Sequence, residues 1–192
     1  MDTSLISILL ALVSGVAIAA ACGLRAFLPL LALGLAARFG LFHLRAGAEW
    51  MAGDPALWAL GIATVLEILS DKVPVVDHML DAVGTLIRPA AAWLGAFAVL
   101  NGWGSPWAQI AALVLGAGAL AVHGVKAKTR LGSTVATAGH ANPLLSVVED
   151  SGVLVLVAAA IFVPLLALGL ILITVWWVER WRRRRSTAIL AP

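Results

Sequence analysis

Charged residues and cysteine are scarce in this sequence. Asp, Glu, Lys and Arg make up 12% of the 192 residues, whereas hydrophobic residues make up 62%. Soluble domains are about one quarter charged, so a chain this apolar cannot cover a globule with polar surface and needs lipid around it. Cys22 is the single cysteine, which excludes an internal disulfide. We interpret it as a small residue packed between helices.

Several kinds of motif are also missing. No polar tract is long enough for a soluble domain, so we predict an all-α, polytopic transmembrane helical bundle that forms a single domain over residues 1–178. The sequence has no P-loop, nucleophile elbow or dinucleotide fingerprint. Its four histidines are scattered, without a cysteine or a close histidine partner, so we predict neither a zinc site nor a cofactor.

Two short segments indicate an internal repeat. Gly23-Leu24-Arg25-Ala26 and Gly124-Val125-Lys126-Ala127 each follow a long apolar run. Residues 5–26 laid on residues 106–127 without a gap give seven identities, and a basic residue is kept at the third position of the motif. We predict repeat halves over residues 5–72 and 106–178, joined by a linking helix over residues 75–101.

The apolar runs predict about seven membrane crossings, each near the length of about twenty residues that a helix needs. They cover residues 5–22, 26–44, 56–70, 75–101, 106–123, 131–148 and 152–178. Pro29 falls in the first turn of the second segment, where a proline is tolerated. An alternative with fewer crossings makes segments 26–44 and 131–148 half-helices that enter the membrane and return, and charge alone does not decide between the two.

The C-terminal residues 179–192 form a basic tail. Arg180 and the run Arg182-Arg183-Arg184-Arg185 follow the last apolar segment, which is typical of a cytoplasmic anchor on anionic lipid. No basic domain accompanies the tail, so we expect no nucleic-acid partner, and we leave homo-oligomer formation open. With the tail in the cytoplasm and seven crossings, the turn at residues 101–106 lies outside.

A set of polar and charged residues is predicted to line or close a path through the membrane. Ions stranded in hydrocarbon are costly, so they face the protein interior, pair with each other or line water. Glu67 is the strongest candidate, because the stretch around it is otherwise apolar. The candidate pathway residues are Arg25, Glu67, Asp71, Lys72, Asp77, Asp81, Lys126, Arg130, Asn142, Glu149 and Asp150.

Three functions fit this set. The first is a small transporter or channel for an ion or small solute, in which carboxylates hold a cation or proton and the basic residues balance them. The second is a non-transporting membrane scaffold or assembly factor whose charges form closed pairs. The third is a Mg²⁺-dependent lipid-modifying enzyme, because Asp77 and Asp81 are one helical turn apart and two carboxylates can hold Mg²⁺ at a diphosphate.

Three strings carry a resemblance to a known family. They are Gly23-Leu24-Arg25-Ala26-Phe27-Leu28-Pro29, Glu67-Ile68-Leu69-Ser70-Asp71-Lys72-Val73-Pro74-Val75-Val76-Asp77, and Asn142-Pro143 followed by Glu149-Asp150. Together they resemble domain of unknown function 4126, a family of small bacterial membrane proteins, over roughly residues 5 to 175. The resemblance implies a multi-span protein of the bacterial inner membrane and no established activity. The arginine tail lies outside it.

Overall fold

The computed structural model describes residues 5–70 and 74–189, and every regular element in those ranges is helical. The elements are α1 (Leu5–Leu24), α2 (Leu28–Arg38), the 3-10 helix η1 (Glu49–Ala52), α3 (Asp54–Ser70), α4 (Pro74–Val99), α5 (Ser105–Thr137) and α6 (Asn142–Ile189). The all-α fold class is therefore confirmed for the described chain.

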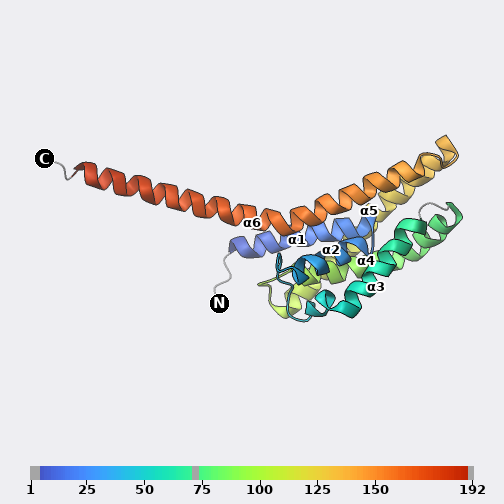
Figure 1. Cartoon of the computed structure of the whole chain (residues 1–192), viewed down its shortest axis with the longest axis horizontal. Helices are drawn as coiled ribbons and strands as arrows, with labels where there is room; N and C mark the ends of the chain where they lie inside the picture. The colour runs from blue at the N-terminus through green and yellow to red at the C-terminus, as the bar shows by residue number, and fades with distance from the viewer. Residues whose placement is uncertain (1–4, 71–73, 190–192) are drawn as a thin grey trace.

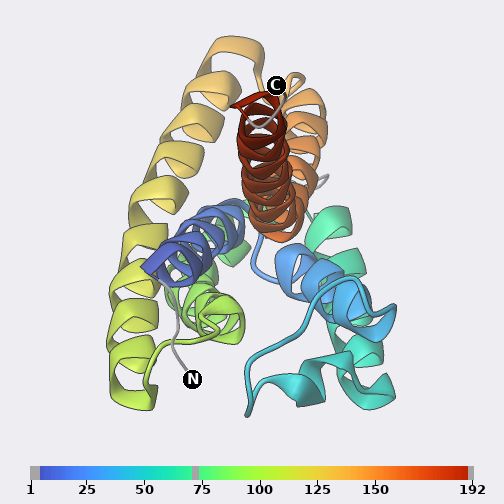
Figure 2. The ribbon, with the colours of Figure 1, turned by 90° about the vertical axis from the view of Figure 1, so that its left-hand side faces the viewer.

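Helix α1 lies at the centre of the bundle, where it packs against α4, α5 and α6 (Figure 1). Helix α2 packs mainly against α3, η1 and α6, and Figure 2 shows α2, η1 and α3 as a group beside α1. Small residues allow the close approach: a Cβ added to Gly23 would lie 2.7 Å from Val122 Cβ, and one added to Gly95 would lie 2.6 Å from Ile18 Cγ2. Close packing of small residues is typical of membrane helices.

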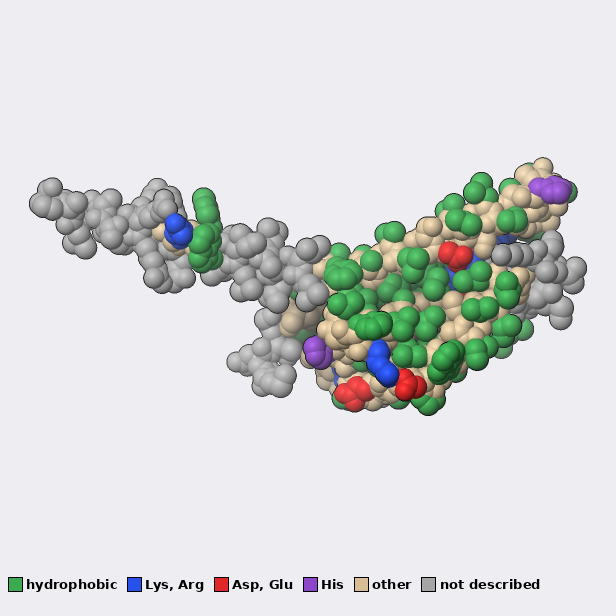
Figure 3. Space-filling view, in the orientation of Figure 1, with side chains coloured by type: hydrophobic (Ala, Val, Ile, Leu, Met, Phe, Trp, Pro, Cys, Tyr) green, Lys and Arg blue, Asp and Glu red, His purple; other side chains and the backbone are tan. Residues whose placement is uncertain are grey.

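The exterior of the bundle is apolar. Figure 3 shows hydrophobic side chains spread over the visible face, and large ones such as Leu86 and Val135 are about four-fifths exposed, at 79% and 80%. Among the described residues, four helical segments are long and apolar enough to cross a membrane: Leu5–Leu24, Ala82–Val99, Ser105–Thr137 and Asn142–Val163. These features are those of an integral membrane protein, because such a surface requires lipid around it.

The second predicted crossing is much shorter than expected. Helix α2 has 11 residues, which span about 16 Å and cannot cross a hydrocarbon core of about 30 Å. The segment 26–44 is therefore not a crossing helix, and its length suits the half-helix alternative. Pro29 does lie in the first turn of α2, as predicted.

The single crossing helix predicted over residues 131–148 is absent. Helix α5 continues through Lys126 and Arg130 to Thr137, and a turn then separates it from α6, which contains Glu149 and Asp150. The chain reverses at Ala138 and Gly139, whose φ angles of 51° and 84° lie in the left-handed region that ends helices. Basic residues between 126 and 130 therefore do not mark a loop.

This hairpin also affects the predicted placement of the turn at residues 101–106 relative to the basic tail. Because α6 returns antiparallel to α5, its C-terminal end points toward the same end of the bundle as the α4–α5 turn (Figure 1). The sequence had predicted the turn at residues 101–106 and the basic tail on opposite sides of the membrane. Helix α6 continues through the basic residues to Ile189, and the guanidinium of Arg180 lies 5.2 Å from the centre of the Trp176 ring; the cytoplasmic side of this tail stays a prediction.

The internal repeat is not confirmed. The predicted first half contains α1, α2, η1 and α3, whereas the second contains α5 and most of α6. Gly23-Leu24-Arg25-Ala26 ends a helix, but Gly124-Val125-Lys126-Ala127 lies inside α5. A helix does cover most of the predicted range 75–101, as α4, and Cys22 is fully buried between helices as expected.

Candidate charged site at the break between α1 and α2

The site forms where the chain breaks between α1 and α2. Helix α1 ends at Leu24 and α2 begins at Leu28, which leaves Arg25, Ala26 and Phe27 outside either helix. Helix ends expose amide groups at the N-terminus and carbonyl groups at the C-terminus that have no partner within the helix. In lipid these groups must find partners in the protein. The neighbouring helices supply them.

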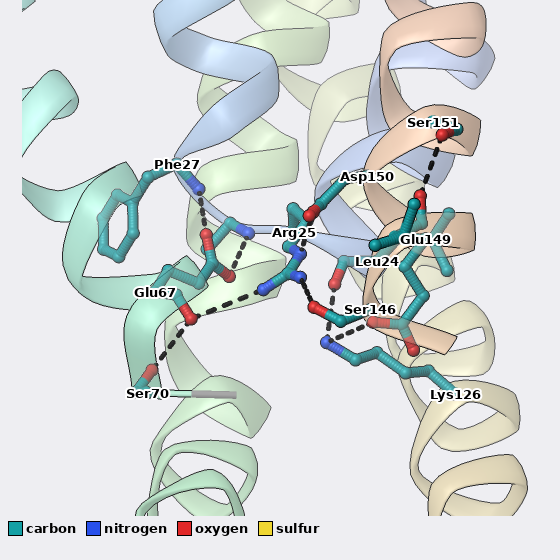
Figure 4. A network of polar contacts seen from close by, with 12 residues as sticks. Leu24, Arg25, Phe27, Glu67, Ser70, Lys126, Ser146, Glu149, Asp150 and Ser151 are labelled. Atoms are coloured by element: carbon teal, nitrogen blue, oxygen red, sulfur yellow. Dashed lines mark hydrogen bonds and ion pairs between the residues drawn. The ribbon is translucent and has the colours of Figure 1, made fainter. Parts of the chain in front are cut away.

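The carboxylate of Glu67, on α3, binds the amide end of α2. Its Oε1 accepts a hydrogen bond from Ala26 N at 2.8 Å, and its Oε2 accepts one from Phe27 N at 3.2 Å (Figure 4). Phe27 at the N-cap position gives α2 no side-chain cap of its own. A negative charge also suits the positive end of the helix dipole. Glu67 therefore caps α2 from another helix.

Two basic side chains bind the carbonyl end of α1. Lys126 Nζ, on α5, donates to Leu24 O at 3.0 Å, and Arg88 Nη1, on α4, donates to Gly23 O at 3.2 Å. Arg88 Nη1 also lies 2.6 Å from His123 Nδ1. A guanidinium has no acceptor, so His123 Nδ1 accepts this hydrogen bond and carries no proton. Positive charge at this end of α1 matches the negative end of its dipole.

Arg25 lies at the centre of the site and is fully buried, with 0% of its surface exposed. Its Nε lies 2.7 Å from Asp150 Oδ1, and its Nη2 donates to Ser146 Oγ at 2.7 Å, so it binds α6 twice. Its Nη1 points to Glu67 O on α3 at 3.4 Å. Figure 4 shows the guanidinium between these groups. Arg25 thus joins the break to α3 and α6 together.

Glu149 on α6 neutralises two cations of α5. Arg130 Nε donates to Glu149 Oε1 at 3.0 Å and Arg130 Nη2 donates to Oε2 at 2.5 Å, which is a bidentate pair. Lys126 Nζ lies 3.4 Å from the same Oε2. Charge-assisted bidentate pairs are among the stronger hydrogen bonds in proteins. Breaking a buried pair by removing one partner typically costs about 3–5 kcal/mol.

The structure brings six of the predicted residues together. Arg25, Glu67, Lys126, Arg130, Glu149 and Asp150 all belong to the contacts around the break. Asn142 lies apart from them, at the start of α6, where its Nδ2 donates to Thr134 Oγ1 at 2.9 Å.

Four predicted residues lie outside the described part. Asp71 and Lys72 fall between the described ranges, and the side chains of Asp77 and Asp81 are not described. The magnesium alternative rests on Asp77 and Asp81 and so stays a prediction. Among the residues that are described, no group of three or more His, Cys, Asp or Glu side chains comes together as a metal site would require.

Three residues of the site were missed from the sequence. Arg88, His123 and Ser146 were not predicted as candidate site residues. Their partners are far away in the chain: His123 is 35 residues from Arg88, and Ser146 is 121 residues from Arg25. The sequence signal that could have identified Arg88 is an arginine inside a predicted membrane helix, because such a charge needs a partner in the protein.

Comparisons with known proteins give a family but no activity. No curated protein and no solved structure matches the chain. A family model does match it, over residues 12–184, and this range includes every contact of the break described above. The chain belongs to the family described as Domain of unknown function (DUF4126).

Proposed function

We propose that this protein is a small transporter or channel, which carries an ion or small solute past the charged site at the break between α1 and α2. The observation that carries the proposal is the break itself, with both helix ends directed at charged side chains of other helices. Broken helices at membrane depth are tolerated where they are buried in protein or line a water-filled path. In secondary transporters, such breaks form the substrate and ion sites.

The charges at the break suit reversible binding. The amide end of α2 holds a carboxylate, that of Glu67, and a small anion could take the same place when Glu67 moves away. The carbonyl end of α1 holds Lys126, whose ammonium also contacts Glu149. If a solute of the same charge replaced one of these protein groups, the other charged groups of the site would keep their partners. We place the protein in the bacterial inner membrane, with anionic lipid as the partner of its arginine tail.

A specific observation also favours the alternative of a non-transporting scaffold. The carboxylates of Glu67, Glu149 and Asp150 already bind protein groups, and Arg25 is completely buried. A closed arrangement of this kind fixes how helices pack without needing a solute. In that case the break serves assembly, and substitutions in it change stability but no flux.

One experiment separates the two functions. The protein is reconstituted into sealed vesicles, and the fluxes of protons, K⁺ and Cl⁻ are measured with fluorescent indicators for wild type, Glu67→Gln and Glu49→Gln. Glu49 is an exposed residue of η1 and gives the same chemical change away from the break. Transport predicts a wild-type flux of at least one ion that Glu67→Gln abolishes and Glu49→Gln keeps.

The thermal unfolding of the same three proteins in detergent provides the control for folding. A folded Glu67→Gln protein with undiminished flux would contradict the proposed site. Absence of flux in wild type, together with a lower unfolding temperature for Glu67→Gln alone, would favour the scaffold.

A further inference from the structure

Beyond the break, polar residues continue along the facing sides of α5 and α6. On α5 they recur one turn apart after Arg130, and on α6 they precede Glu149 at the same spacing, so each set lies on one helix face. We name this face-to-face set the α5–α6 seam. Its members are Arg130, Ser133 and Thr134 on α5 and Asn142, Ser146 and Glu149 on α6.

Two atoms in the seam are buried without a hydrogen-bond partner. Asn142 is 5% exposed, and its Nδ2 binds Thr134 Oγ1, but its Oδ1 accepts nothing. Ser133 Oγ is also enclosed and unpaired. Thr134 cannot help, since its hydroxyl already donates to Arg130 O at 2.9 Å. Buried polar atoms in native proteins nearly always have a partner, and ordered water supplies it where protein does not.

We infer that the α5–α6 seam holds water and opens the charged site to one side of the membrane only, the side of the α5–α6 turn. Water donates a hydrogen bond to Asn142 Oδ1 and meets the Ser133 hydroxyl. From there, Ser146 and Glu149 continue the polar path along α6 to Arg25. The ligand of this subsite is thus a small hydrogen-bond donor, namely water.

The length of the helices supports access from this side. The rise of an α-helix places Asp150 about 12 Å along α6 from Asn142, whereas Lys126 lies about 32 Å along α5 from Ser105 at the other end. The charged site is therefore much nearer to the α5–α6 turn than to the α4–α5 turn.

The packing toward the other end contrasts with the seam. There α1 meets α5 and α6 through buried residues that are mostly apolar, among them Ala11, Ala112, Val157 and Ala160. In the described part of this contact, the buried hydroxyl of Ser14 donates to Ala160 O at 2.7 Å and so has a hydrogen-bond partner. Among the described residues outside the charged site, the buried polar side-chain atoms without a hydrogen-bond partner are those of the seam, Ser133 Oγ and Asn142 Oδ1.

This inference deepens the proposed function and rests on it, since a one-sided path has a purpose only where a solute reaches the site. Its test measures how accessible positions in the seam are to water, and does not measure flux. In a Cys22→Ala background, Asn142→Cys, Ser133→Cys and Ser14→Cys are made, and the protein is reconstituted in vesicles. The rate of modification by a membrane-impermeant, positively charged methanethiosulfonate is measured with reagent added to each side in turn.

The inference predicts that Asn142→Cys and Ser133→Cys react at least about tenfold faster than Ser14→Cys, because thiols ionise and react where water reaches them. Both should react from the same side and not from the other. Ser14 is the matched control, since it is as buried as Asn142, at 2% exposed, but lies in a contact whose hydroxyl is satisfied.

Several results would overturn the inference. They are reaction of Asn142→Cys at the rate of Ser14→Cys in a folded protein, or equal reaction from both sides. If Asn142→Cys does not fold, the labelling rate of Ser133→Cys is compared with that of Ser14→Cys in the same way. If the protein shows no flux and yet is labelled from one side only, the proposed function is contradicted and the hydrated seam is supported. The failure of the proposed function and the failure of this inference are therefore distinguishable.

Discussion

The two Gly-x-basic-Ala segments share a sequence pattern but differ in structure. Helix α1 ends within Gly23-Leu24-Arg25-Ala26, at Leu24, whereas the helix through Gly124-Val125-Lys126-Ala127 continues for about three further turns. Pro29 favours the break in the first segment. It has no amide to bond to Arg25 O, and its ring disfavours a continuous helix through the preceding turn. No proline follows Lys126 until Pro143.

This comparison shows how the site is made. The broken segment exposes backbone groups, and the unbroken segment carries the ammonium of Lys126 that binds one of them, Leu24 O. The basic residue of the motif therefore makes different contacts in the two segments. Arg25 binds α6 and α3, and Lys126 binds the end of α1. Substitutions in matched pairs, one in each segment, test this difference.

The largest effect is expected at the broken segment itself. Arg25→Met removes a fully buried cation and leaves Asp150 and Ser146 without its guanidinium, so the free energy of unfolding should fall by about 3–5 kcal/mol. Thermal unfolding in detergent measures the change. An unfolding temperature equal to that of wild type would show that the Arg25 contacts do not hold the bundle together.

The matching change in the unbroken segment should cost less. Lys126→Met removes the donor to Leu24 O but leaves Glu149 paired with Arg130, so we expect a loss of about 1.5–3 kcal/mol. Lys128→Met is the control, since Lys128 is exposed on the same helix. It should change stability by less than about 0.5 kcal/mol. Equal effects of the two substitutions would contradict the assigned role of Lys126.

The smallest effect is expected at the two glycines that begin the segments. A Cβ at Gly23 would lie 2.7 Å from Val122 Cβ and 2.8 Å from Ala119 O, so Gly23→Ala should destabilise the protein by about 1–3 kcal/mol. Nothing lies within 4 Å of the same atom at Gly124. Gly124→Ala should therefore be neutral or stabilise α5 by up to about 1 kcal/mol. Chemical denaturation of both variants tests this, and the opposite ranking would contradict the packing of α1 against α5.

Part of the fold follows directly from the sequence. Helix α1, helix α4 and the turn between α4 and α5 were predicted nearly in place, because long apolar runs and the breakers of residues 101–106 are local signals. The continuity of α5 was missed because hydropathy falls at Lys126, Lys128 and Arg130. Two of these charges are satisfied by α1 and Glu149, so the helix has no reason to stop there.

The candidate site was predicted only as a set of residues. Glu67 stood out because an acid within an apolar stretch needs a partner, and this reasoning is local. The identity of its partners, the amides of Ala26 and Phe27, cannot be predicted from local sequence, because it depends on how α3 packs beside α2. For the same reason Arg88 and His123 were not predicted as part of the site. Their roles arise from contacts between α4, α5 and the end of α1.

The central claim is that a carboxylate from α3 binds the open backbone at the break between α1 and α2. The most direct test is the proton and nitrogen NMR shifts of the backbone amides of Ala26 and Ala127, which hold the same position in the two segments, in wild type and in Glu67→Gln. The account predicts that the Ala26 amide proton loses a strong hydrogen bond and moves upfield, while Ala127 stays unchanged. An unchanged Ala26 resonance in the folded variant would contradict it.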